Sequence, residues 1–299
     1  MNRGIAGLVA WLAVLGTLAS GVRADAQGNS GFGHAHGGGH VTAPSATAAG
    51  SPSSAPGSAA DGQTSAGDVR NFGTWLDDAS VMPKGAGFVT VGFAYWRGQA
   101  LREFDFPMID TGLALHRRVQ VGMSVPYYYA HEPGSAGVRG FGNLYLTTKV
   151  QVEDPSTHRL GFAVTPMLEV LDAPPLTGGS RMNWALPANV ELRRSGWRAF
   201  GSGGYFSRGA VFASGAIEAA LSERAWVTGS ASETYSTRAN PGLDATTLPR
   251  AQTDVTGGLT LVVAPNVSVY GTIGHTISNR EVNGGTVNVA AGVSLNFQR

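Results

Sequence analysis

Residues 143–153, Asn-Leu-Tyr-Leu-Thr-Thr-Lys-Val-Gln-Val-Glu, alternate apolar and polar side chains along their length. One face of such a strand carries Leu144, Leu146, Thr148, Val150 and Val152, and the other carries Asn143, Tyr145, Thr147, Lys149, Gln151 and Glu153. A strand with one apolar and one charged face fits a membrane, because the apolar face contacts lipid while the polar face contacts a water-filled lumen. Closing such strands into a barrel leaves no unpaired backbone in lipid. The stretch therefore predicts a transmembrane β-barrel.

The same alternation recurs through the last two-thirds of the chain. It predicts an all-β fold, a transmembrane antiparallel β-barrel of about 12 strands that follows a disordered N-terminal segment. Each alternating stretch is close to the roughly 9–11 residues that a tilted transmembrane strand needs. The expected strands are 87–96, 105–115, 118–130, 142–153, 159–170, 182–193, 197–207, 210–220, 225–235, 250–263, 267–277 and 285–297.

The connections between these strands alternate in length, with only 207–210 departing from the rule. Tight turns lie at 116–118, 154–157, 194–196, 222–224 and 264–266, and longer loops at 97–104, 131–141, 171–181, 236–249 and 278–284. Outer-membrane barrels have short periplasmic turns and longer extracellular loops. An even strand count then predicts that both ends of the barrel domain lie on the periplasmic side.

The parity of each strand predicts which side chains contact lipid. The outward set includes Val89, Val91, Phe93, Tyr95, Val119, Val121, Met123, Val125, Tyr127, Leu186, Val190, Leu192, Val255, Leu259, Leu261, Val263, Val287, Val289, Val293, Leu295 and Phe297. Aromatic residues near the strand ends predict two belts at the membrane surfaces. The loop-side belt is expected to hold Tyr95, Trp96, Tyr127, Tyr128, Tyr129, Trp184 and Tyr235, and the turn-side belt Trp197 and Trp226.

Composition removes several classes of protein. The net charge of +1 offers no electrostatic reason for binding nucleic acid. The absence of cysteine excludes disulfides, thiolate metal sites and a lipoprotein anchor. Beyond the first 20 positions there is no apolar run long enough for a spanning helix. No cofactor is expected.

The front of the chain predicts export and disorder. Residues 1–26 resemble a cleaved signal peptide, with a basic start, an apolar core over 5–18 and the site Ala24-Asp25-Ala26. An uncleaved anchor is the alternative interpretation. Residues 27–70 form a Gly/Ser/Ala/Pro tract that cannot bury enough apolar surface to order itself, so we expect a disordered linker. The barrel domain is then 71–299, in the bacterial outer membrane.

Three histidines stand close together in the linker. His34, His36 and His40 have the spacing of a weak, transient site for Zn, Ni or Cu. The alternative is a solvated linker in which the histidines are incidental, since no carboxylate is visible to orient the rings.

Charged side chains on the inward parity predict the lining of the lumen. They include Arg198 if the Gly/Ala-rich seventh strand, 197–207, alternates regularly. Facing lipid they would cost up to about 2–4 kcal/mol each, so we expect them inside. Acids and bases could cross-link a plugged interior or line a hydrated pore, and 12 strands enclose more space than the roughly eight whose side chains fill the lumen. We predict as pore-lining residues Asp110, Arg118, Tyr145, Lys149, Glu153, Glu169, Glu191, Arg193, Glu218 and Asp254.

The barrel histidines give no credible catalytic pair. His116 and His158 belong to turns, His131 begins a loop, and His275 has the outward parity while Thr276 faces inward. No nucleophile and base therefore share a face at a workable spacing. We predict that the protein is not an enzyme.

Two stretches carry a family resemblance. Residues 140–149, Gly-Phe-Gly-Asn-Leu-Tyr-Leu-Thr-Thr-Lys, and the lead-in from Asp77-Asp78-Ala79 to Pro83-Lys84-Gly85 resemble outer-membrane channel proteins grouped with the meta-pathway phenol-degradation proteins. The resemblance covers about residues 72–299. It implies an outer-membrane barrel, with uptake of hydrophobic or aromatic compounds as a function of some members.

The expected function is an outer-membrane channel or transporter for small, hydrophobic or aromatic solutes. A non-conducting structural or surface barrel is the alternative, and an outer-membrane hydrolase a weaker one. The expected partners are outer-membrane lipid and lipopolysaccharide, a small-molecule solute, and the barrel-insertion machinery, since Phe297 resembles the terminal aromatic that this machinery recognises. No nucleic-acid partner is expected.

Overall fold

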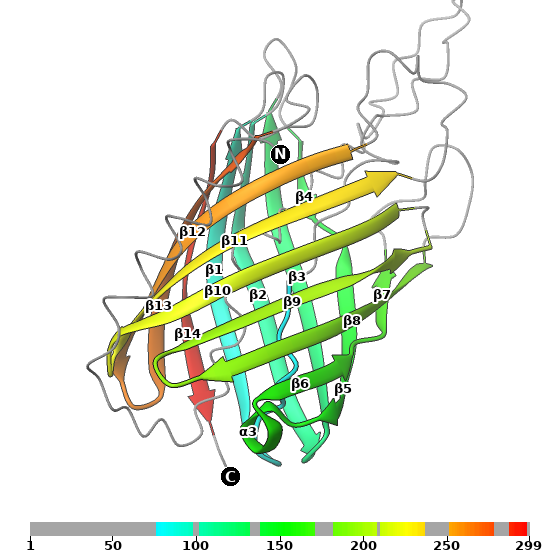
Figure 1. Cartoon of the computed structure of the whole chain (residues 1–299). Coiled ribbons are helices and arrows are strands. Elements are labelled where there is room, and N and C mark those ends of the chain that lie inside the picture. The colour runs from blue at the N-terminus through cyan, green and yellow to red at the C-terminus, as the bar shows by residue number, and fades with distance from the viewer. Residues whose placement is uncertain are drawn as a thin grey trace, which may run out of the picture.

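The computed structural model describes residues 76–97, 102–131, 138–170, 182–207, 210–236, 251–277 and 287–297, which form one closed antiparallel β-barrel (Figure 1). The predicted fold class is confirmed. The strands are β1 Gly87–Arg97, β2 Arg102–His116, β3 Val119–His131, β4 Val138–Phe141, β5 Leu144–Glu153, β6 Leu160–Val164, β7 Met167–Val170, β8 Met182–Arg194, β9 Trp197–Phe206, β10 Ala210–Ser222, β11 Ala225–Ser236, β12 Ala251–Ala264, β13 Val267–Thr276 and β14 Val287–Phe297. One short helix, α3, spans Pro155–His158.

Fourteen labelled segments make twelve barrel strands, because two strands are interrupted. The strand β4–β5 breaks at 142–143 and pairs with β3 on both sides of the break. The strand β6–β7 breaks at 165–166, and both halves pair with β5 and β8. The barrel closes where β1 pairs with β14 over their whole length, from Gly87 opposite Phe297 to Arg97 opposite Val287.

The break at 165–166 is repaired by hydrogen bonds to both neighbouring strands. A proline has no backbone donor, so Pro166 cannot continue a strand ladder. The Thr165 amide donates to the Pro187 carbonyl at 2.9 Å, and the Pro166 carbonyl accepts from the Thr148 amide at 3.0 Å. The Asn189 side-chain amide donates to Thr165 Oγ1 at 2.7 Å inside the barrel. The wall therefore stays closed at the break.

Helix α3 lies in the tight turn after β5. The Asp154 side chain caps it by accepting from the Ser156 amide at 2.8 Å, and Arg159 ends it with a φ of 64°. No helix in the described ranges is long and apolar enough to cross a membrane.

The outward parity of the strands is confirmed. Large apolar side chains on it are well exposed on the barrel surface, including Val91 at 43%, Leu186 at 50% and Leu259 at 42%. At the loop end, Tyr127 makes edge-on ring contacts with Tyr129 and Phe141 at centroid distances of 5.3 and 5.2 Å. This group, with Trp184 and Tyr205, forms an outward aromatic belt there.

Two aromatics that the sequence placed in this belt lie elsewhere. Trp96 and Tyr128 are each only 7% exposed and lie on the inward parity. The reason is geometric: neighbouring residues of a strand point to opposite faces, so Tyr127, Tyr128 and Tyr129 cannot all face lipid.

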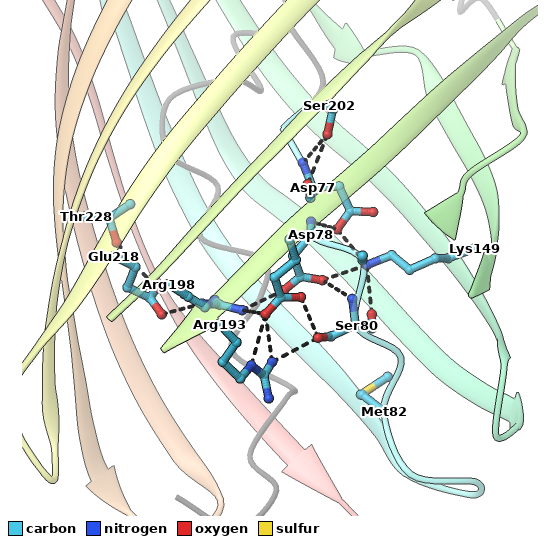
Figure 2. Close-up of polar contacts among 12 residues, drawn as sticks. Asp77, Asp78, Ser80, Met82, Lys149, Arg193, Arg198, Ser202, Glu218 and Thr228 are labelled. Carbon is cyan, nitrogen blue, oxygen red and sulfur yellow. Dashed lines mark hydrogen bonds and ion pairs between the residues drawn. The ribbon is translucent and has the colours of Figure 1, made fainter. Parts of the chain in front are cut away.

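The described chain begins inside the barrel. Residues 76–82, which we call the inner segment, run between the walls toward the tight-turn end, where β1 starts after the turn at Lys84-Gly85 (Figure 2). The sequence analysis placed both ends of the barrel domain on the periplasmic side and did not anticipate a segment inside the barrel. The barrel interior at this level is filled by the chain's own lead-in.

Candidate functional site

Three strands hold the backbone of the inner segment through single side chains. Ser202 Oγ on β9 accepts from the Asp77 amide at 2.8 Å and donates to the Asp77 carbonyl at 3.0 Å. Gln151 on β5 donates to the Ala79 carbonyl at 3.1 Å, and Gln120 on β3 accepts from the Met82 amide at 3.3 Å. The segment is therefore attached to the walls by specific hydrogen bonds.

Lys149 holds the two acids of the inner segment. Its Nζ lies 2.7 Å from Asp77 Oδ1 and 3.0 Å from Asp78 Oδ1, and it also donates to the Ser80 carbonyl at 3.1 Å. All three donor hydrogens of the ammonium group are used. Lys149 is 4% exposed and both acids are 1% exposed, so these ion pairs are shielded from water.

Arg198 joins the inner segment to β9 and β10. Its Nη1 lies 2.8 Å from Asp78 Oδ2, and its Nε lies 2.7 Å from Glu218 Oε1 on β10. Glu191 Oε1 lies 3.7 Å from the same Nη1. Asp78 thus bridges Lys149 on β5 and Arg198 on β9 (Figure 2). We call this group of charges, with Arg193, the latch.

Glu191 and Arg193 complete the latch through a serine. Ser80 Oγ donates to Glu191 Oε2 at 2.6 Å and accepts from Arg193 Nη2 at 2.9 Å. Arg193 Nη2 also lies 2.8 Å from Glu191 Oε1. Glu191 is completely buried, whereas Arg193 is half-buried.

The energetics of the latch favour an intact closed state. Burying several charges is costly, and the cost is offset only when each charge is paired and hydrogen-bonded. Withdrawing the inner segment would leave Lys149 in the interior without Asp77 and Asp78. Removing one partner of a buried pair commonly costs about 3–5 kcal/mol. The segment therefore rests firmly in place unless water enters with its departure.

On the loop side of the latch, one part of the interior is apolar, while β2 places the buried acids Glu103 and Asp105 at the same end. Tyr145, Met167, Ala185, Phe206, Ala210 and Phe212 form one buried cluster, which we call the apolar chamber. The Phe206 and Phe212 rings lie 5.3 Å apart. The cluster has one polar edge, where Glu169 Oε1 accepts from Tyr145 at 3.0 Å and from Asn143 at 2.9 Å. Inward side chains of the loop-side half can thus contact an apolar molecule.

The wall next to the latch carries small hydroxyl side chains. The inward positions of β11–β13 include Thr228, Ser230, Thr256, Thr260 and Thr272, and they line a cavity of about 10 Å³ together with Tyr270. A cavity of that size holds about one water molecule. This cavity is too small for an organic solute.

Most residues predicted to line the pore lie in the buried interior. Lys149, Glu191, Arg193 and Glu218 belong to the latch, and Tyr145 and Glu169 belong to the apolar chamber or its edge. Asp110 is buried on the inward face of β2, and Asp254 on β12 accepts from Thr276 Oγ1.

Two of the predicted residues lie at the turn end instead. Arg118 is exposed in the turn between β2 and β3. Glu153 is 49% exposed at the end of β5, with its Oε1 3.0 Å from His158 Nε2. The strand irregularity between Gln151 and Glu153 explains this placement, since it displaces Glu153 from the regular ladder. The predicted metal site at His34, His36 and His40 lies outside the described residues.

Sequence reasoning did not assign a role to Asp77, Asp78 or Ser80. They appeared only in the lead-in stretch that carried the family resemblance. The structure brings that stretch against the other one, since Asp77 and Asp78 bind Lys149. The position of Lys149 is the feature that could have pointed to them. Lys149 pairs with Gln120 on β3 and lies beside the break at 165–166 on its other side. An inward lysine without an acid directly opposite it on either strand needs a partner from elsewhere in the chain.

Comparison with solved structures shows that this barrel shares its fold with outer-membrane proteins. The COG4313 outer membrane channel from Pseudomonas putida F1 superposes with a TM-score of 0.60 at 11% identity, over 74% of this chain and 98% of that one. The NanC porin gives 0.52 at 8% identity, over 69% of this chain and 98% of that one. The chain has the fold of an outer-membrane β-barrel. No protein-family model matches the sequence, and no curated protein matches it either.

Proposed function

We propose that the chain is a bacterial outer-membrane channel for small hydrophobic or aromatic solutes, kept closed at rest by its inner segment. It would be exported by the cleaved signal peptide at 1–26, and its functional relatives would be the channels grouped with the meta-pathway phenol-degradation proteins. The observation that carries the proposal is the order of the interior: an apolar chamber on the loop side, then a latch made of separable charges.

The apolar chamber and the latch would act on a solute one after the other. A solute entering from the loop end would pack against Phe206, Phe212 and Met167 and leave water, which favours apolar and aromatic molecules. Tyr145 and Glu169 offer one polar contact at the chamber edge. Passage then needs the inner segment to leave the latch, because the segment lies between the walls and is hydrogen-bonded to β3, β5 and β9.

The closed and open states differ in what pairs with the charges of the latch. In the closed state, Asp77 and Asp78 satisfy Lys149 and Arg198. In the open state, water entering the lumen would hydrate the same four groups, which reduces the cost of separating them. A passing solute therefore needs no charge of its own, and the mixed signs along the wall favour neither anions nor cations.

A non-conducting structural barrel is the second candidate, and the buried latch is the observation that favours it. A segment held by ion pairs at 2.7–3.0 Å can equally be a permanent filling of the barrel. The two functions differ in one property: only a channel conducts when the segment is released.

The deciding experiment measures conductance in planar bilayers. Asp77→Asn with Asp78→Asn removes the charges that bind Lys149 and Arg198, and we expect conductance steps more frequent or larger than those of the wild type. Heat-modifiable gel mobility verifies that each variant is folded. A folded double variant that stays electrically silent would support the structural barrel instead.

A reversible version uses the absence of native cysteine. Ser202 Oγ contacts both backbone polar atoms of Asp77, so Asp77→Cys with Ser202→Cys introduces one thiol on the inner segment and one on the strand that holds it. The oxidised protein should be closed and the reduced protein open, with each single variant as the control. Equal conductance before and after reduction, with the disulfide verified by thiol counting, would contradict gating by the inner segment.

The solute class is tested by uptake of a labelled aromatic compound into cells. Phe212→Ala enlarges and weakens the apolar chamber, and we expect uptake to fall severalfold. Phe162→Ala is the matched control, because Phe162 is 38% exposed on the outward face of β6. Unchanged uptake in the Phe212 variant and in a gene deletion would reject this solute class.

The histidines of the linker are a separate proposal. His34, His36 and His40 would bind Zn or Ni weakly in the periplasm. Calorimetry of the 27–70 peptide with either metal tests it, and an absence of heat at millimolar metal would reject it.

A further inference from the structure

On its outer face the barrel has a groove of about 820 Å³ across β1, β2, β3 and β5, strands that lie side by side in Figure 1. Its apolar lining includes Leu113, Leu115, Val121, Met123 and Leu146. These residues share the outward parity, and four of them are 38–52% exposed. The lining also contains inward-parity residues, namely Phe88, Gly112, Ala114, Gly122 and Thr147, but the exposed apolar side chains of the groove face the membrane.

Small residues create the hollow. Thr111 and Thr148 lie in the lining among the larger Val, Leu and Met side chains. Behind them, Gly112 and Gly122 on the inward parity carry no side chain, and the Phe88 ring occupies the space next to Gly112. The size falls in the range of about 300–1,000 Å³ typical of ligand pockets.

The groove lies at the tight-turn end and has a basic rim. Lys84 is part of the lining, and the Gly85 amide donates to the Ala114 carbonyl at 2.9 Å, which places Lys84 beside the end of β2. The turn that follows β2 contains Arg117 and Arg118, and all three basic residues are exposed. The nearest acid on β5, Glu153, lies 3.0 Å from His158.

We propose that this groove binds an anionic phospholipid of the periplasmic leaflet, with an acyl chain along Leu113, Val121 and Leu146 and the phosphate at Lys84 and Arg117. Charge complementarity selects the occupant. Basic residues next to an apolar pocket at a membrane surface favour anionic headgroups. Lipopolysaccharide lies in the opposite leaflet, at the loop end, so a phospholipid is the ligand within reach. The inference requires the barrel to be in the outer membrane and does not depend on what passes the lumen.

Native mass spectrometry of the full-length barrel tests the proposal. The protein is released from detergent after exposure to equal amounts of phosphatidylglycerol and phosphatidylethanolamine with the same acyl chains. We expect the wild type to retain phosphatidylglycerol preferentially. Lys84→Gln with Arg117→Gln should reduce that preference by about fivefold for each base removed.

A second variant probes the apolar part of the site. Thr148→Phe fills the groove floor and should lower retention of both lipids, with Thr111→Phe as the substitute if the first variant fails to show heat-modifiable mobility. The matched controls are Arg224→Gln, an exposed base in the turn between β10 and β11, and Ala213→Phe, a small outward residue of β10. Both controls should behave as the wild type.

Three results would overturn the proposal. One is an unchanged lipid preference in the Lys84 and Arg117 double variant. Another is an equal loss of lipid in the controls, which would indicate non-selective annular binding. The third is retention of lipopolysaccharide in place of phospholipid.

Discussion

Two walls of the barrel interior share one architecture but differ in their chemistry. The charged wall, which is β5, β8, β9 and β10, carries Lys149, Glu191, Arg193, Arg198 and Glu218. The hydroxyl wall, which is β11–β14, carries Thr228, Ser230, Thr256, Thr272 and Ser294 at inward positions. Among the described residues, Asp77 and Asp78 of the inner segment form ion pairs with Lys149 and Arg198 of the charged wall. The water-sized cavity lies against the hydroxyl wall.

The difference explains why the inner segment is placed asymmetrically. A charged side chain can hold a buried acid strongly, because the pair is shielded from water and hydrogen-bonded. A threonine can replace water at a surface but offers no comparable attraction. The charged wall therefore positions the segment, and the hydroxyl wall leaves the remaining space hydrated. This division predicts large effects on one wall and small ones on the other.

The largest effect is expected from Arg198→Ala on the charged wall. The substitution leaves Asp78, Glu191 and Glu218 buried around a missing cation, so the free energy of unfolding should fall by about 3–5 kcal/mol. Urea titration in lipid, followed by heat-modifiable mobility, measures it. Arg224→Ala in an exposed turn is the matched control and should change little. A loss below about 1 kcal/mol, the value of a surface pair, would contradict a shielded latch.

A moderate loss of stability is expected from Gly292→Ala on the hydroxyl wall, because the Tyr270 ring occupies the space next to this glycine. A Cβ at Gly292 would lie 2.7 Å from Tyr270 Cε1, so Gly292→Ala forces the ring away and should cost about 1–3 kcal/mol. A Cβ at Gly229 would meet nothing within 4 Å, which makes Gly229→Ala the control. Combining Gly292→Ala with Tyr270→Ser should recover part of the loss. Strict additivity would show that the ring and Gly292 do not interact.

The smallest effect on stability is expected from Thr272→Leu. The added volume fills the space of about 10 Å³ beside Tyr270, with no charge left unpaired. We expect unfolding to shift by less than about 1.5 kcal/mol, while any residual ion leak through the closed wild type decreases. Ala213→Leu on the outward face is the control for conductance. An unchanged leak in the Thr272 variant would place the hydrated path elsewhere than along the hydroxyl wall.

Local pattern was sufficient for the wall of this barrel. The alternation in 143–153 predicted that Lys149 points inward and Val150 outward, and burial agrees, with Lys149 at 4% and Val150 at 39% exposed. The alternation and the turns between strands also gave nearly correct bounds for β12 and β14. The reason is that a strand in a barrel wall has only two faces, and placing a charged side chain on the lipid face costs a large free energy.

Residue type and position near a strand end were not sufficient to place a side chain. Trp96 and Tyr128 are aromatic and near strand ends, as belt residues are, but each follows an outward tyrosine and therefore points inward. Glu153 has the inward parity of Lys149, yet an irregularity two residues from its strand end moves it to the surface.

The sequence by itself determined a closed barrel with a lipid-facing and a lumen-facing side, because side-chain alternation is a local property of each strand. Only the tertiary structure decided what fills the lumen. Asp77 and Asp78 precede the first strand, and no local pattern distinguishes them from acids of a solvated linker. Their partner Lys149 is 72 and 71 positions away. Barrel closure brings the two together, and the cost of an unpaired buried charge keeps them there.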